Sequence, residues 1–114
     1  TLTTPNIDSA QFATVSGTAP LYSARAWVNF NGTGTVAIRA SGNVTSITDN
    51  GTGNYTVNFT TALSDANYCP QISSSGDGAV NVVQSFTTTS VQALFIDYGA
   101  SYRDVTYGLV VIFR

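Results

Sequence analysis

The 114-residue sequence contains no histidine, lysine, glutamate or methionine, and it has a single cysteine. The absence of histidine removes the commonest general base and the commonest transition-metal ligand. With neither histidine nor lysine, a serine nucleophile lacks its usual activating base. The lone Cys69 permits no intrachain disulfide and no cysteine-based zinc site, and we expect it to be a small buried apolar residue. These absences predict a protein that is not an enzyme and that has no cofactor or metal site.

Charge is also scarce. Charged residues make up 9% of the chain, all of them Arg or Asp, and the net charge is -2, whereas a typical soluble domain has roughly 25% charged residues. Nucleic-acid-binding proteins need basic patches, so we expect no nucleic-acid partner. No apolar run approaches the roughly 20 residues that span a bilayer, which argues against membrane insertion. Aspartates could form a glycosidase pair or bind calcium, but Asp49, Asp65, Asp77 and Asp104 lie in or beside expected turns, where Asp caps backbone amides.

The residues that are abundant favour strands and turns. Ala26, Val28 and Phe30 fall on one face of an expected strand, and Arg25, Trp27 and Asn29 fall on the other. The same alternation recurs over residues 54–60 and over residues 35–40, where Val36, Ile38 and Ala40 fall on one face. The tetrapeptide NGTG occurs at residues 31–34 and 50–53, and we interpret both copies as hairpin turns. About eight strands are expected, which predicts an all-β antiparallel β-sandwich or flattened barrel over residues 22–114.

Residues 1–21 show no periodicity and are expected to form an extended lead-in. The chain opens on Thr1 rather than methionine, so we expect it to be a piece of a longer chain or a processed product.

The expected last strand, residues 105–113, is apolar on both faces. Val105, Tyr107, Leu109, Val111 and Phe113 fall on one face, and Val110 and Ile112 fall on the other. A sandwich strand normally has one polar face. The strand is therefore either central and covered by loops, or buried against another subunit, which is the interpretation we favour. The candidate interface residues are Tyr107, Leu109, Val110, Val111, Ile112 and Phe113.

Candidate recognition residues lie in two loops, residues 73–78 and 97–104. They are Ser75, Asp77, Tyr98, Tyr102, Arg103 and Asp104, because aromatic rings and arginine are enriched at recognition hot spots. The alternative is that Tyr98 closes the core and Arg103 pairs with Asp104. Trp27 could stack on a sugar ring, but we expect it in the core.

Residues 25–68, RAWVNFNGTGTVAIRASGNVTSITDNGTGNYTVNFTTALSDANY, resemble a segment near the C-terminus of tail-fibre and related structural proteins of tailed bacteriophages, marine and cyanobacterial phages among them. The resemblance fades after residue 68. It implies a homotrimeric virion fibre, located outside the cell, whose tip domain contacts a glycan or protein of the bacterial surface. Residues 1–21 would then be the end of a fibre shaft. The fibre could belong to the tail, the baseplate or the head.

The resemblance supplies no catalytic motif. Two alternatives stay open at this point: a purely structural trimerisation or capping domain of a phage particle, and a carbohydrate-binding module of a cell-wall enzyme.

Overall fold

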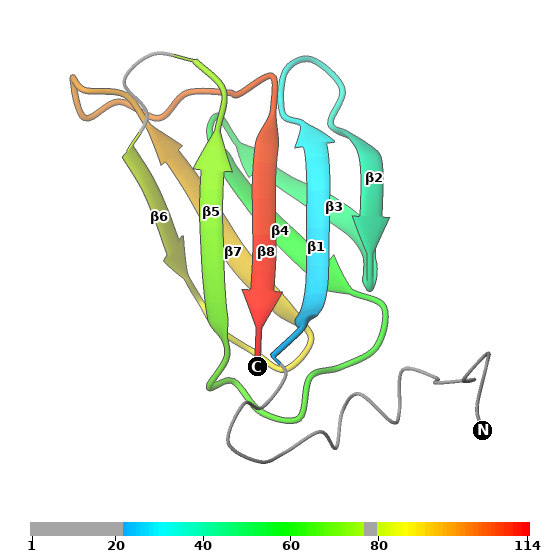
Figure 1. Cartoon of the computed structure of the whole chain (residues 1–114). Helices are drawn as coiled ribbons and strands as arrows, with labels where there is room; N and C mark the ends of the chain where they lie inside the picture. The colour runs from blue at the N-terminus through cyan, green and yellow to red at the C-terminus, as the bar shows by residue number, and fades with distance from the viewer. Residues whose placement is uncertain (1–21, 77–79) are drawn as a thin grey trace, which may run out of the picture.

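The computed structural model describes residues 22–76 and 80–114, which contain eight β-strands. The strands are β1 Ala24–Asn31, β2 Ala37–Gly42, β3 Val44–Gly51, β4 Asn54–Phe59, β5 Cys69–Ser74, β6 Val80–Gln84, β7 Ser90–Ile96 and β8 Gly108–Phe113. They form two four-stranded sheets that face each other (Figure 1): sheet A in the order β2-β1-β8-β5, and sheet B in the order β3-β4-β7-β6. All pairings between the strands are antiparallel. The expected antiparallel β-sandwich is confirmed.

The core lies between the two sheets and is built by the alternation that the sequence displays. Phe30 of β1, Tyr55 of β4 and Phe95 of β7 are fully buried, and their ring centroids lie 5.1 to 6.2 Å apart. Edge-to-face and tilted contacts at such distances are the arrangements that aromatic rings prefer. The smaller buried side chains of β1 and β8, Ala26, Val28, Val110 and Ile112, complete the contact of sheet A with sheet B.

The two NGTG copies form different turns. The first does not form a two-residue hairpin at Asn31-Gly32, because β1 and β2 are joined by five residues, 32–36. The Asn31 side chain instead accepts hydrogen bonds from the backbone N (3.0 Å) and hydroxyl (2.6 Å) of Thr33. The second copy is a tight turn, since only Thr52 and Gly53 separate β3 from β4.

Other expected details also differ. Residue 105 lies outside β8, which begins at Gly108, because the Val105 carbonyl accepts a bond from Gly32 N (2.8 Å) instead of joining the ladder. Ala40 does not share the face of Ile38, because the register shifts and pairs Ala40 with outward-facing Asn29, whereas Ile38 pairs with inward-facing Phe30. Pro70 lies in β5, at the edge of sheet A, as proline in a strand predicts.

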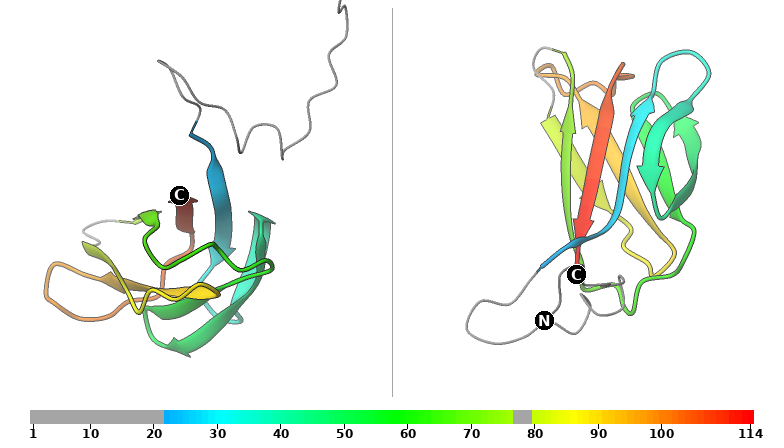
Figure 2. Two further views of the ribbon diagram at one scale, coloured as in Figure 1. Left: turned by 90° about the horizontal axis from the view of Figure 1, so that it is seen from below. Right: turned by 45° about the vertical axis from the view of Figure 1, so that its right-hand side comes forward.

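The two ends of the sandwich differ in what they carry. The start of β1 and the end of β8 lie at one end, and the β1–β2, β3–β4 and β7–β8 connections lie at the opposite end, here called the distal end (Figures 1 and 2). Residues 1–21 and 77–79, which include the expected lead-in, are outside the described residues. Within the described part of the chain there is no helix long and apolar enough to cross a membrane.

Candidate functional site

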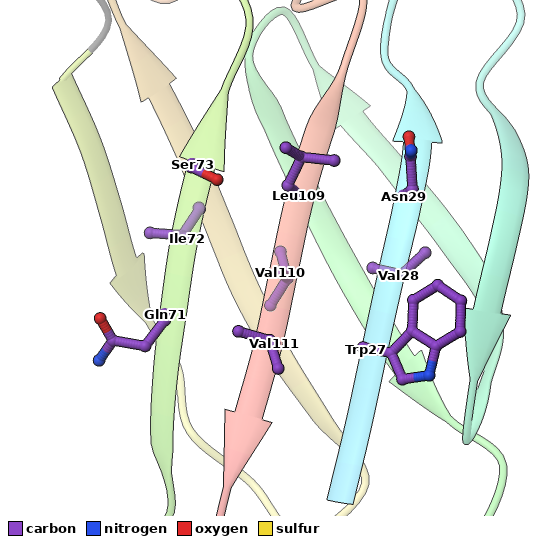
Figure 3. Close-up of a pocket in the computed structure, with 9 residues that line it drawn as sticks. All are labelled: Trp27, Val28, Asn29, Gln71, Ile72, Ser73, Leu109, Val110 and Val111. Atoms are coloured by element: carbon purple, nitrogen blue, oxygen red, sulfur yellow. The ribbon is translucent and has the colours of Figure 1, made fainter. Parts of the chain in front are cut away.

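The outer face of sheet A carries apolar side chains at its centre. Leu109 and Val111 of β8 point away from the core, opposite Asn29 and Trp27 of β1 on one side. On the other side they pair with Ser73 and Gln71 of β5. These side chains surround a shallow hollow of about 520 Å³ that opens on the outer face (Figure 3). Trp27, Leu109 and Val111 therefore form an apolar middle of this face, and polar Asn29, Gln71 and Ser73 lie around them.

Trp27 belongs to this outer face and not to the core, so the sequence-based expectation is wrong. Because Ala26 and Val28 point inward, strand alternation turns Trp27 outward, and 43% of it is exposed. Its indole lies over Gly42 of the neighbouring strand β2, where an added Cβ would come within 2.8 Å of ring atom Cδ1. The glycine thus lets the indole lie close to the sheet. The alternation of Ala26, Val28 and Phe30 was the signal that should have placed this tryptophan.

Arg39 lies at one corner of this face, and the sequence predicted no role for it. Its guanidinium carbon lies 3.9 Å from the centroid of the Tyr107 ring, and its Nη1 donates to Asn29 Oδ1 at 3.3 Å. A cation over an aromatic ring at this distance is attracted by the ring quadrupole. Arg39 and Tyr107 therefore form an ordered rim beside Leu109.

The residues expected to form the interface separate into two groups. Val110 and Ile112 are buried in this chain's own core and cannot contact a second subunit, which corrects their assignment. Leu109, Val111 and Phe113 point outward on a strand that is central in its sheet. Of the six candidates, Tyr107, Leu109, Val111 and Phe113 thus remain available to a partner, with Trp27 added.

The β3 and β4 side of sheet B has a different outer surface. Asn58 Nδ2 donates to the hydroxyls of Ser46 (3.1 Å) and Thr48 (2.9 Å), and Asn50 Nδ2 donates to the hydroxyl of Thr56 (2.8 Å). Short polar side chains therefore bond to one another across the strands and are open to water. The same fold thus accommodates a polar outer surface, so folding alone does not require the apolar surface of sheet A.

Cys69 is exposed and not buried, which corrects the sequence-based expectation. It begins β5 opposite Phe113 of β8. The Gln71 amide donates to its sulfur at 3.3 Å. The inward side chains of β5 are Pro70 and Ile72, and alternation turns Cys69 out.

At the distal end, Asp104 holds the turns together. Its Oδ1 accepts bonds from Gly53 N (2.9 Å) and from the Tyr55 hydroxyl (2.7 Å), which also lies 2.8 Å from the Gly32 carbonyl oxygen. Burial raises the pKa of Tyr55 above its usual value of 10.0, and the hydrogen bond and charge of Asp104 raise it further. Asp104 thus links both NGTG turns to the β7–β8 connection, and it was predicted as a recognition residue although its contacts are structural.

Two more recognition candidates, Ser75 and Asp77, follow β5 in the sequence. The Ser75 hydroxyl accepts from Tyr107 N, and Ser75 N donates to the Tyr107 carbonyl, both at 3.1 Å. Asp77 is outside the described residues. Ser75 therefore fastens the end of β5 to the approach of β8.

Tyr98 and Tyr102 remain as exposed recognition candidates. Tyr98 is 86% exposed and so does not close the core, which removes that alternative, and Tyr102 is 53% exposed. Arg103 approaches Gly76, where an added Cβ would meet its guanidinium. The β7–β8 connection thus brings Tyr98, Tyr102 and Arg103 to the distal end, and their role in recognition stays a prediction.

The four described aspartates all accept backbone N–H groups. Asp49 accepts from Gly51 N (3.0 Å), and Asp97 accepts from Ser101 N (3.0 Å). Asp65 accepts from Asn67 N and also pairs with Arg114 at 2.7 Å, and these bonds lower the pKa of its carboxyl to about 2. Among residues 22–76 and 80–114, no group of three potential metal-ligating side chains gathers at one place. The aspartates therefore act as turn residues.

No protein-family model, no curated protein and no solved structure matches this chain.

Proposed function

We propose that this chain is a non-enzymatic tip domain of a virion fibre, which assembles as a homotrimer and attaches the particle to a bacterial surface. The apolar outer face of sheet A carries the assembly part of the proposal. It has the composition of a subunit interface, with Trp27, Leu109 and Val111 at the centre and Arg39 and Gln71 toward the rim. Three copies related by a threefold axis would remove these side chains from water.

The arrangement of the two ends supports the attachment part. The start of β1 and the end of β8 lie at one end, where a fibre shaft would join in this proposal, and the β7–β8 connection with exposed Tyr98 and Tyr102 lies at the opposite end. The resemblance of residues 25–68 to phage fibre proteins agrees with this arrangement. The four aspartates within residues 22–76 and 80–114 accept bonds from backbone amides, as turn residues do.

The assembly part is tested by the mass of the chain in solution. Light scattering after size-exclusion chromatography should give about 36 kDa, three times the 11.9 kDa of one chain. Val111→Asp places a charge at the centre of the face and should give a monomer, because an unpaired buried carboxylate is costly. Val82→Asp is the matched control, because Val82 is an exposed valine on β6 of the other sheet. A wild-type monomer at micromolar concentration would refute the trimer.

The attachment part is tested separately. The purified trimer should adsorb to host cells and block infection by competing with virions. A trimer that does neither would favour a purely structural trimerisation or capping domain, which the same apolar face would serve equally well.

One observation favours a different class of function. Exposed Trp27 with Asn29 and Gln71 around a hollow could also bind a sugar, as a carbohydrate-binding module of a cell-wall enzyme would. Trp27 is the only tryptophan, so its fluorescence reports on this face alone. Quenching by cell-wall oligosaccharides in a chain that stays monomeric would support this alternative over the fibre.

A further inference from the structure

We infer that the loop of residues 97–102 is a preformed aromatic platform for a neutral saccharide, with Tyr98 and Tyr102 as the residues that stack on the sugar rings. This inference rests on the proposed attachment function and names the chemical class of the surface ligand. The observations that carry it are the exposure of the two tyrosines, the internal bonding of the loop and its place at the distal end.

The loop is ordered by its own hydrogen bonds. Ala100 N donates to the Asp97 carbonyl (3.0 Å), which closes a tight turn around Tyr98 and Gly99. Asp97 N donates to the Ser101 carbonyl (2.8 Å), and the Asp97 carboxylate accepts from Ser101 N (3.0 Å). Because the turn is closed in the free chain, a ligand would not have to order it, and less free energy is lost on binding.

The base of the loop is fixed as well. Tyr102 forms an isolated antiparallel bridge with Ile96 at the end of β7. The next residue, Arg103, donates its backbone N to the Phe95 carbonyl at 3.0 Å. The backbone that carries the two rings is therefore joined to sheet B, and Tyr98 is held away from the protein with 86% of its surface exposed.

The size of the platform fits a few sugar rings better than a protein partner. A covered aromatic side chain contributes roughly 150–250 Å², and because 86% of Tyr98 and 53% of Tyr102 are exposed, the two tyrosines offer about 210–350 Å². A stable protein interface buries about 800 Å² on each partner. A pyranose presents C–H groups on one face that pack on an aromatic ring, and the tyrosine hydroxyls can bond to its hydroxyl groups. Tyrosine is also the residue that gives large contact area at low entropic cost in binding loops.

The charges near the platform favour a neutral ligand. The connection contains Asp97, Arg103 and Asp104, a formal charge of +1 − 2 = −1. The carboxylates of Asp97 and Asp104 already accept bonds within the chain. An acidic saccharide or a nucleic acid would need an excess of basic groups here.

The test uses the full chain and compares three variants of the platform and one control variant with the wild type. Tyr98→Ala and Tyr102→Ala remove the rings, whereas Tyr98→Phe keeps the ring and removes the hydroxyl. Tyr22→Ala is the matched control, because Tyr22 is also highly exposed (78%) but precedes β1 at the opposite end. Circular dichroism and light scattering verify that each variant keeps the fold and oligomeric state of the wild type.

Binding is measured to immobilised neutral bacterial polysaccharides and to whole cells of a strain that the wild-type chain adsorbs to. Cells are used untreated, after periodate, which cleaves the vicinal diols of sugars, and after protease. We expect each alanine variant to lose about 10-fold or more in affinity, as truncation of an aromatic anchor does, and Tyr22→Ala to bind like the wild type. Tyr98→Phe should keep most of the affinity, and periodate but not protease should abolish adsorption.

Different results overturn different statements. If adsorption is lost after protease and kept after periodate, the ligand is a protein and the inference is wrong while attachment stands. Unchanged binding by both alanine variants also refutes the inference alone. If the wild-type chain adsorbs to no cell and no polysaccharide, the attachment function fails and the inference fails with it.

Discussion

The two NGTG turns provide a matched pair for testing how the distal end is packed. Gly34 and Gly53 are the last residues of the two copies, and both adopt the left-handed conformation, with φ of 61° and 64°. Gly34 has open space where a Cβ would be, with no atom within 4 Å. An added Cβ on Gly53 would lie 2.5 Å from the Phe95 carbonyl oxygen and 2.6 Å from the Arg103 carbonyl oxygen. The same substitution to alanine therefore has equal backbone strain and unequal steric cost.

The expected magnitudes follow from this geometry. A left-handed conformation costs an L-residue about 1–2 kcal/mol, so Gly34→Ala should lower the free energy of unfolding by about that much. Gly53→Ala adds a clash with two backbone segments, for which overpacking costs of about 1–3 kcal/mol are typical. The shift would also disturb the bonds of Gly53 N to Asp104 and of Phe95 N to the Gly53 carbonyl, each worth about 1 kcal/mol. The difference between the two variants should be at least about 2 kcal/mol.

Urea unfolding followed by far-ultraviolet circular dichroism measures this difference. The two variants and the wild type are compared at one protein concentration, because assembly shifts apparent stability. If Gly34→Ala and Gly53→Ala lower the free energy of unfolding equally, the second turn is not packed against the β7–β8 connection, and Asp104 does not link the two.

Three further predictions test other parts of the molecule. Tyr55→Phe should lower the free energy of unfolding by about 1.5–3 kcal/mol at pH 7, because it removes a bond to a charged group. Because the folded-state pKa of Tyr55 is raised, the stabilisation by its hydroxyl is complete below pH 10 and is lost progressively above it. In urea titrations, the difference in stability between wild type and variant should therefore shrink by about 1.4 kcal/mol per pH unit above pH 10. Asn43→Gly keeps the left-handed conformation (φ 56°) but loses the side-chain bonds to the backbone of Arg25 and Thr61, so the urea midpoint should fall by an amount equal to about 1–3 kcal/mol; an unchanged midpoint would show that these bonds do not stabilise the fold. The fluorescence emission of Trp27 should move to shorter wavelength as the wild-type chain is concentrated, because assembly buries the exposed ring. In Val111→Asp the emission should not change with concentration. A spectrum of the wild type that is independent of concentration would contradict burial of this face.

The sequence was informative where one face of a strand is buried. The alternation of Ala26, Val28 and Phe30, and of Tyr55, Val57 and Phe59, placed these residues in the core correctly, because a period of two leaves only one register that hides them all. Turn residues marked most strand ends. The order of strands in the sheets was not predicted, since periodicity identifies which face is buried but not which strand is the neighbour.

The candidate site was harder to predict for a different reason. Residue type suggested that Trp27 and Cys69 lie in the core. Both are exposed, because the alternation of side chains along each strand turns them outward. Asp104 looked like a recognition residue because it lies in a polar loop. Its role depends on Gly53 and Tyr55, which are about fifty positions away in the chain and come close only in the folded sandwich. Contacts of this kind leave no local pattern.

The proposed interface and the proposed platform are mechanically connected, and this determines how attachment would depend on assembly. The β7–β8 connection that carries Tyr98 runs directly into β8, whose outer face would meet the partner subunits. Between them the chain is fixed at Asp104, at buried Val105 and at Tyr107, which bonds to Ser75. In a trimer the three platforms would therefore keep a constant spacing. Rigid spacing raises avidity only for ligands that repeat at that distance, so Val111→Asp should reduce adsorption to cells far more than it reduces the binding of one chain to a short saccharide.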